Sequence, residues 1–371
     1  MENSDFAMMP EELKDVIRSK LPPKSLARCI VVSKEWERSI GDRSLQHAHY
    51  QESKKQPMLV LLRLCQRRVW NDGEPQYESF NTVNQERPQP IADPHHVTTL
   101  PNSDFAVTSG PIRGLLCLHS DRYLVLCNPA IRKCLTVLEF EPEPPQTRKR
   151  FNHRGFLFGF DEQSKAFKVI KTEAGDHNLP WRHEIFTVQP GEVIWRQIDC
   201  PRPYTPITNS LSIEGNVYLG AVHNKTCLAV TVNLTTESIL ITELPTAFLL
   251  KLGITKLRSY NGQPCLVSDS AHELATTGKF KICVKDKDSG LWGEREVEVK
   301  GWSEKVTGSY SFEGTIPSGE LVFAKKKLET GFQMLLYYDP RMETFNEYQI
   351  QTEEDYDSAE IFLNHKPSIY I

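Results

Sequence analysis

The chain has 371 residues, a net charge of −4 and 39% hydrophobic residues, so it can hold a small module and one large domain. Charges of both signs are mixed along it, which does not favour a nucleic-acid partner. The longest strongly apolar run, residues 58–62, is too short to cross a membrane, and the first twenty residues lack a secretory apolar segment. We therefore expect an intracellular protein with no membrane segment, in the cytoplasm, the nucleus or both.

Residues 9–40 are predicted to form a compact set of short helices. Leu13, Val16, Ile17 and Leu21 recur at helical spacing and form one apolar stripe. Two consecutive prolines, at 22 and 23, end the first helix, and Ser33 can cap a later one. About thirty residues have too little core to stand alone, so their apolar faces should dock on something else. The pattern is typical of an adaptor rather than a catalyst.

The same segment resembles the F-box, at Pro-Glu-Glu-Leu (10–13), Leu-Pro-Pro-Lys-Ser-Leu (21–26) and Val-Ser-Lys-Glu-Trp (32–36). Two positions depart from the usual motif, which opens with Leu-Pro where this chain has Met9-Pro10 and often has an aromatic where Leu45 stands. The resemblance implies docking on a Skp-type adaptor and, through it, on a cullin. The local excess of Lys and Arg between residues 10 and 40 suits an acidic adaptor of that kind. The adaptor-binding residues it implies are Pro10, Leu13, Ile17, Leu21, Pro22, Ser25, Leu26, Val32 and Trp36.

From about residue 58 the apolar period changes to two, and the rest of the chain is predicted to be all-β. Pairs of hairpins repeat, with units starting near residues 112, 155, 210, 254 and 309. That spacing is slightly longer than the 40–50 residues or so of a four-stranded propeller blade. A sixth unit could combine residues 57–80 with residues 360–371, which would close the ring with strands from both ends. The alternative is a β-sandwich or a partly open sheet.

Fragments of this region resemble the F-box associated domain of plant proteins. They include Tyr-Leu-Val-Leu-Cys-Asn-Pro-Ala-Ile-Arg-Lys (123–133), Phe-Gly-Phe-Asp-Glu (158–162) and Ser-Ile-Glu-Gly-Asn-Val-Tyr (212–218), in the family's order. The resemblance implies an α+β multidomain protein. Residues 1–50 would be a helical F-box module, and residues 51–371 a propeller-like domain of about five to six four-stranded units.

No motif for catalysis, a metal or a cofactor is evident. His95-His96 lacks a surrounding ligand cluster, and residues 286–290 have no calcium ligand at the twelfth position, so a hairpin turn is expected there. The basic runs 148–150 and 325–327 are interpreted as loop and hairpin charge, with contact to an acidic partner as the alternative. Five of the nine cysteines lie in predicted strands and should be reduced and buried: Cys117, Cys127, Cys227, Cys265 and Cys283.

Two proline-rich stretches, residues 83–111 and 141–154, are predicted to be surface loops. These loops, with Trp181 and Tyr204 as exposed aromatics, are candidates for a substrate face, although the sequence does not identify substrate-binding residues. Trp195 and Trp292 are expected to pack inside the domain.

The leading hypothesis is a substrate receptor of an SCF-type ubiquitin ligase, which captures an unidentified target protein and performs no bond chemistry itself. One alternative is a propeller enzyme or small-ligand binder with an adaptor-like N-terminus. Another is an F-box protein of a non-degradative complex. The sequence leaves open the target, any modification or ligand that gates its recognition, and the compartment.

Overall fold

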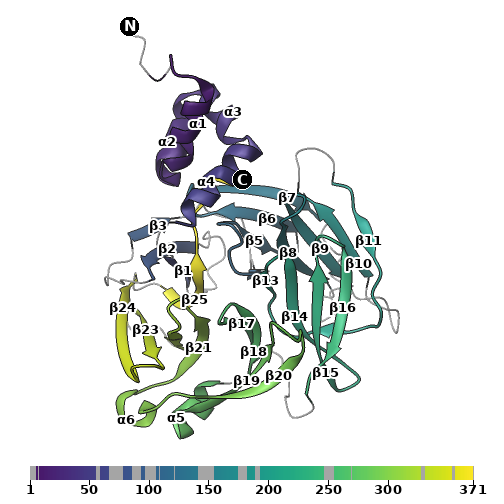
Figure 1. Cartoon of the computed structure of the whole chain (residues 1–371), viewed down its shortest axis with the longest axis vertical. Coiled ribbons are helices and arrows are strands. Elements are labelled where there is room, and N and C mark those ends of the chain that lie inside the picture. Colours follow the sequence, from purple (N-terminus) through teal and green to yellow (C-terminus); the bar gives the residue numbers. More distant parts are fainter. Residues whose placement is uncertain are drawn as a thin grey trace, which may run out of the picture.

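The computed structural model describes a helical module at one end and a ring of β-sheets (Figure 1). The described residues are 6, 8–55, 59–66, 78–85, 93–96, 106–107, 109–120, 122–140, 154–173, 182–188, 193–245, 255–268, 270–326, 331–352 and 356–370.

The helical module consists of four helices, and local sequence signals account for most of their ends. Prolines precede and start the second helix, Ser33 accepts a hydrogen bond from the backbone N–H of Trp36, and Asp42 accepts two at the start of the fourth. The sequence did not predict this fourth helix. The helices are α1 (Glu11–Lys20), α2 (Pro23–Val32), α3 (Lys34–Ile40) and α4 (Arg43–Ser53).

The β region is a six-bladed propeller, which confirms the prediction of repeated four-stranded units. Blade 1 contains, from one edge of its sheet to the other, β25 (Tyr356–His365), β1 (Leu59–Gln66), β2 (Glu78–Asn84) and β3 (Asp93–His96). Blade 2 contains, in sheet order, β4 (Ala106–Val107), β5 (Leu116–His119), β6 (Tyr123–Asn128) and β7 (Lys133–Glu139). The order in blade 3 is β11 (Arg196–Ile198), β10 (Arg182–Thr187), β9 (Ala166–Glu173) and β8 (Arg154–Asp161).

The other three blades continue the ring with the same antiparallel pairing. Blade 4 contains β12 (Thr205–Pro206) and β13 (Leu211–Ile213), both paired with β14 (Asn216–His223), then β15 (Thr226–Asn233) and β16 (Ser238–Glu243). Blade 5 contains β17 (Lys256–Tyr260), β18 (Gln263–Val267), β19 (Lys279–Lys285) and β20 (Trp292–Glu298). Blade 6 contains β21 (Tyr310–Thr315), β22 (Leu321–Lys325), β23 (Phe332–Asp339) and β24 (Thr344–Gln351). Two short helices, α5 (Ser270–Thr277) and α6 (Trp302–Lys305), lie at the outer edge of blades 5 and 6 (Figure 1).

The ring is closed by strands from both ends of the chain. β25 pairs antiparallel with β1, with Leu61 opposite Phe362 and Arg63 opposite Glu360. Closure removes two exposed sheet edges, which would otherwise be sites for pairing with other chains. The prediction that the sixth unit combines both termini is therefore confirmed.

The prediction of a continuous surface loop over residues 83–111 is wrong. β3 lies within this stretch and pairs with β2, and β4 pairs with β5. Proline is tolerated in β3 because that strand is at the edge of its sheet. Most of the second predicted loop, residues 141–153, lies outside the described residues.

Apolar side chains from facing strands fill the spaces between neighbouring blades. Between blades 5 and 6, Phe280 packs on Phe312 with ring centroids 5.1 Å apart, and Trp302 packs on Phe323 at 4.9 Å. Along each strand every second side chain points to the same face of the sheet, so alternate residues contribute to this packing. These sheet-to-sheet contacts hold the blades in a ring.

A glycine in β21 gives a direct test of this packing. Gly314 has φ +136°, and a Cβ placed there would lie 3.0 Å from the carbonyl oxygen of Ser259 in blade 5. We expect Gly314→Ala to lower the free energy of unfolding by about 2–3 kcal/mol, because both the backbone conformation and the approach are unfavourable for alanine. Gly293→Ala is the control, since its Cβ would meet nothing within 4 Å. Urea unfolding of both variants checks this; an equal loss in both would contradict the packing described.

Candidate functional site

The first helix exposes three of the four residues of its apolar stripe, while Leu21 at its end packs on the core around Leu26. The exposed fractions are 54% for Leu13, 49% for Val16 and 37% for Ile17, and Val31 of α2 is 85% exposed. Exposure of several large apolar side chains to water on one small module is unfavourable in free energy. We name Leu13, Val16, Ile17 and Val31 the apolar face of the helical module. It is the kind of surface that a partner protein covers.

The buried side of α1 is basic rather than apolar. Arg18 is 1% exposed, and its guanidinium group lies 5.2 Å from the ring of Trp36. Arg18 also forms ion pairs with Asp15 at 2.9 Å, Glu11 at 3.2 Å and Glu35 at 3.4 Å. This network fixes α1 against α3, and with it the orientation of the apolar face.

The other residues predicted to bind an adaptor are divided between surface and core. Pro10 and Pro22 are exposed, while Leu21, Ser25 and Trp36 are partly buried. Leu26 is fully buried inside the module, and the side chain of Val32 lies outside the described part of the chain. The structure thus brings Leu13 and Ile17 together on the surface and uses Leu26 as core.

The C-terminal tail joins the helical module to the propeller. Ile369 is fully buried in one apolar cluster with Leu26 and Ile40 of the module and with Ile131 from the turn between β6 and β7. The side-chain amide of Asn128 donates to the carbonyl oxygens of Ser368 at 3.0 Å and Tyr370 at 2.8 Å. The C-terminal residues therefore pack against both the helical module and the propeller.

A buried arginine strengthens the same junction. Arg113 donates to both carboxylate oxygens of Glu162 at 2.6 Å and to the hydroxyl of Tyr370 at 3.1 Å. Its guanidinium group lies 3.6 Å from the ring centroid of Phe160 and 4.6 Å from that of Tyr50 in α4. Such bidentate and stacked contacts require arginine and fix the direction of the module.

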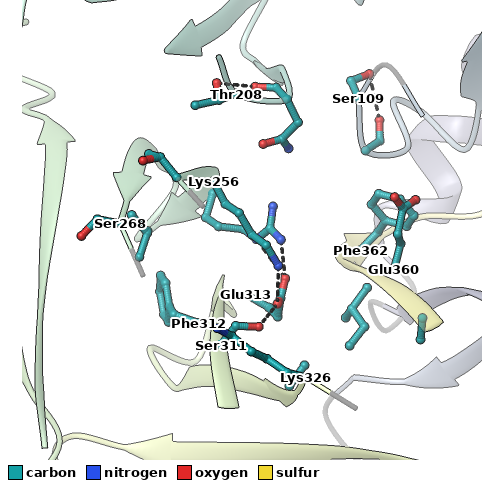
Figure 2. Close-up of a pocket in the computed structure, with 18 of the residues that line it drawn as sticks. Ser109, Thr208, Lys256, Ser268, Ser311, Phe312, Glu313, Lys326, Glu360 and Phe362 are labelled. Carbon is teal, nitrogen blue, oxygen red and sulfur yellow. Dashed lines mark hydrogen bonds and ion pairs between the residues drawn. The ribbon is translucent and has the colours of Figure 1, made fainter. Parts of the chain in front are cut away.

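The second candidate site is a cavity of about 530 Å³ in the ring (Figure 2). It is lined from blades 1, 2, 4, 5 and 6, including β17, β21 and β25, which are edge strands of their sheets. Its volume lies within the range of ligand pockets, about 300–1,000 Å³. The residues with charged groups in the lining are Lys256, Arg258, Glu313, Lys325, Lys326 and Glu360.

A buried carboxylate organises one wall of this cavity. Glu313 accepts hydrogen bonds from Arg258 Nη2 at 2.5 Å and Nε at 2.9 Å, and from the hydroxyl of Ser311 at 2.7 Å. Burial by itself would raise the pKa of Glu313, but Arg258 and Lys256 hold this pKa below its ordinary value. The carboxylate therefore stays ionised and fixes Arg258 in place.

The described part of the chain has no metal-binding cluster, no membrane-spanning helix and no disulfide among its described cysteines. No group of three or more His, Cys, Asp and Glu side chains there could hold a metal ion. No helix among the described residues is long and apolar enough to span a membrane. The described cysteines form no disulfide with one another, and Cys117, Cys127, Cys265 and Cys283 are buried as predicted, with Cys227 partly buried. The His95 and His96 side chains and the basic run 148–150 lie outside the described part.

The aromatic residues correct one prediction about the substrate face. Tyr204 is not an exposed aromatic, because it is buried with its ring stacked on His183 at 5.2 Å. Trp181 lies outside the described residues. Trp292 is buried and Trp195 packs on Phe186 at 4.5 Å, which confirms their role in packing.

Several residues of these sites carry no signal in the sequence. Arg258 and Glu313 are 55 positions apart and meet only when blades 5 and 6 pack. Ile369 stands in an apolar C-terminal segment, which predicts burial but does not identify the helical module as its partner. The basic run that begins with Lys325 and Lys326 was the one available sign of a charged wall.

Comparisons with known proteins agree with this architecture. A family model described as the F-box associated beta propeller domain matches residues 68–369. An F-box protein of Arabidopsis thaliana is 27% identical over 414 residues, which cover 100% of both chains. The F-box protein DOR of the same plant is 26% identical over 387 residues, covering 98% of this chain and 94% of that protein.

Among solved structures, TolB from Acinetobacter baumannii gives a TM-score of 0.47 at 10% identity, covering 86% of this chain and 72% of that one. Prolyl oligopeptidase B from Galerina marginata gives a TM-score of 0.37 at 12% identity, covering 80% of this chain and 41% of that one.

Proposed function

This chain belongs to the plant F-box proteins that carry an F-box associated β-propeller domain, and we propose that it is the substrate receptor of an SCF-type ubiquitin ligase. The helical module docks on a Skp-type adaptor and, through it, on a cullin. The propeller binds the target protein. The chain itself performs no bond chemistry and needs no cofactor, and it works in the cytoplasm, the nucleus or both.

The observation that carries this proposal is the apolar face of the helical module. Leu13, Val16, Ile17 and Val31 are exposed in the chain alone, although Leu26, Ile40 and Leu45 of the module are buried in a core shared with the propeller and the C-terminal tail. Covering these four side chains with a partner would recover the free energy that their exposure costs, about 25 cal/mol for each Å² of apolar surface removed from water. A docking role explains why the stripe faces outward.

The fixed junction between module and propeller supports the second half of the proposal. Ile369 and Arg113 hold the two parts in one orientation. A target bound to the propeller would then be presented at a defined distance from the ligase, which raises its effective concentration there. Rigid linkage serves positioning, and it is unnecessary for a protein that only binds a free ligand.

The test is adaptor binding by a variant of the apolar face. We expect Leu13→Asp with Ile17→Asp to reduce co-purification of a Skp-type adaptor by at least 100-fold, because two charges would be buried without partners in the interface. Circular dichroism and thermal unfolding should be unchanged, since both positions are solvent-exposed helix sites.

A matched control is available on the propeller. Leu240 of β16 and Leu291 before β20 are 59% and 66% exposed, and their double change to Asp should leave adaptor binding intact. Co-purification of the Leu13/Ile17 variant at the level of the unchanged protein would refute the docking surface.

A further inference from the structure

The cavity of the propeller has more positive than negative side chains. Four cationic groups and two carboxylates line it, and both carboxylates already have partners. Glu313 is paired with Arg258, and Glu360 is paired with Arg63 at 2.9 Å. The cavity therefore has an excess of positive charge in a concave site, where a low-dielectric wall focuses the field.

The positive groups are concentrated on one wall. Lys256 and Arg258 come from β17 of blade 5. Lys325 ends β22 of the neighbouring blade 6, and Lys326 follows it. Figure 2 shows Lys256, Glu313 and Lys326 on the same side of the open space, with Glu360 and Phe362 across from them. A ligand with negative charge would thus meet this wall from within the ring.

Contacts within the protein hold the guanidinium group of Arg258 in one position at this wall. Its Nε and Nη2 bind Glu313, and its Nη1 donates to the carbonyl oxygen of Leu257 at 3.1 Å. These bonds use three of the five N–H donors of a guanidinium group and hold its plane. Lys256, whose side chain is 45% exposed, contacts Glu313 only at 3.5 Å and can turn toward an incoming oxyanion.

Neutral groups complete a lining suited to a protein segment. Hydroxyl and amide side chains contribute hydrogen-bonding groups, and apolar side chains offer contact area. The polar neutral residues are Ser109, Thr208, Asn209, Thr255, Ser268 and Ser311, and the large apolar ones are Ile207, Phe312, Ile361 and Phe362.

We propose that this cavity receives a negatively charged segment of the target protein, whose carboxylate or phosphate groups pair with Lys256, Lys326 and Arg258. The inference rests on the proposed receptor function and names the class of target that the receptor takes. It also assigns a role to the basic run at residues 325–327, which is otherwise only hairpin charge.

The experiment measures binding of the full chain to fluorescein-labelled hexapeptides by fluorescence anisotropy at low salt. Hexaglutamate is the carboxylate probe, a hexapeptide with three phosphoserines is the phosphate probe, and a glycine–serine hexapeptide is the neutral reference. We expect one or both anionic probes to bind at least tenfold more tightly than the reference. Lys256→Gln with Lys326→Gln should remove that difference.

A charge-matched control separates the cavity from the general field of the protein. Lys281→Gln with Lys300→Gln removes two exposed lysines of blade 5 outside the cavity lining and should leave peptide binding unchanged. Equal loss in both variants, or anionic probes that bind no better than the neutral one, would overturn the proposal. Preference for glutamate or for phosphoserine would identify the source of the charge.

Adaptor co-purification of the same proteins keeps this result distinct from the receptor function. The Lys256/Lys326 variant should bind a Skp-type adaptor normally, because the helical module lies outside the ring (Figure 1). Anionic peptide binding without adaptor binding would leave the cavity assignment standing and refute the receptor function. Adaptor binding without anionic peptide binding would do the reverse.

Discussion

Removal of residues 366–371 is expected to detach the helical module from the propeller and to destabilise the protein by more than about 4 kcal/mol. The truncated chain loses Ile369 from the core shared with Leu26, and a buried isoleucine is worth about 2–5 kcal/mol. It also leaves the amide of Asn128 and the guanidinium group of Arg113 without C-terminal partners, at about 1–3 kcal/mol for each buried polar group.

Limited proteolysis and urea unfolding would measure this effect. We expect cleavage between α4 and β1 to become rapid, and an early unfolding transition of the helices to separate from that of the propeller. Adaptor binding should weaken as well, because Ile369 is part of the core beneath the module's own helices.

Two point variants measure the apolar contact of Ile369 and the hydrogen bond of Tyr370 separately. Ile369→Ala should cost about 3 kcal/mol through the cavity it leaves. Tyr370→Phe keeps the ring and loses only the hydroxyl that accepts from Arg113, so it should cost about 1 kcal/mol. A truncated chain with unchanged protease resistance and a single unchanged transition would refute the role of the tail.

The blade pattern could be predicted from the sequence because hairpins depend on local signals. Turns such as Asn261-Gly262 bring together strands that are adjacent in the chain, and period-two alternation identifies the strands themselves. The short strands β3 and β4 lack that alternation. They are strands only because β2 and β5 present free edges to them, and pairing of this kind is not encoded locally.

The candidate sites were also predictable only as far as local sequence signals define them. Helical spacing identified Leu13, Val16 and Ile17 as one stripe but not the side it would face, since the ion pairs of Arg18 decide that. Tyr204 was expected to be an exposed aromatic, yet packing against His183 buries it. The cavity collects residues from five blades, and no local pattern in the sequence marks such a convergence.

Acid is expected to destabilise the propeller well before its carboxylates titrate. His183 and His365 are buried, and burial lowers the pKa of each from 6.5 to about 4. Neither ring nitrogen of His183 has a hydrogen-bond partner among the described residues. Both histidines are therefore neutral in the folded protein at pH 5, where the unfolded chain would protonate them.

The direction of the pH effect follows from proton counts. Between pH 6.5 and pH 4 the unfolded chain binds more protons than the folded one, so stability falls as pH falls through this window. At pH 5 each histidine accounts for a loss of about 2 kcal/mol relative to pH 7.5. The carboxylates of Asp161, Glu237 and Glu313 have lowered pKa values and stay ionised in the folded protein. At pH 5 the unfolded chain protonates them only in small part, so each adds at most about 0.2 kcal/mol to the loss.

Urea unfolding at pH 7.5, 6.5, 5.5 and 5.0 would separate the histidines from other groups. His183→Phe keeps an aromatic ring against Tyr204 and His365→Leu keeps an apolar side chain, and neither replacement titrates. The double variant should lose about 4 kcal/mol less than the unchanged protein between pH 7.5 and pH 5. A smaller slope should remain from His47 and His49, whose pKa values burial also lowers. If the double variant loses stability as steeply as the unchanged protein, the acid sensitivity arises elsewhere, and the two buried rings only fill space.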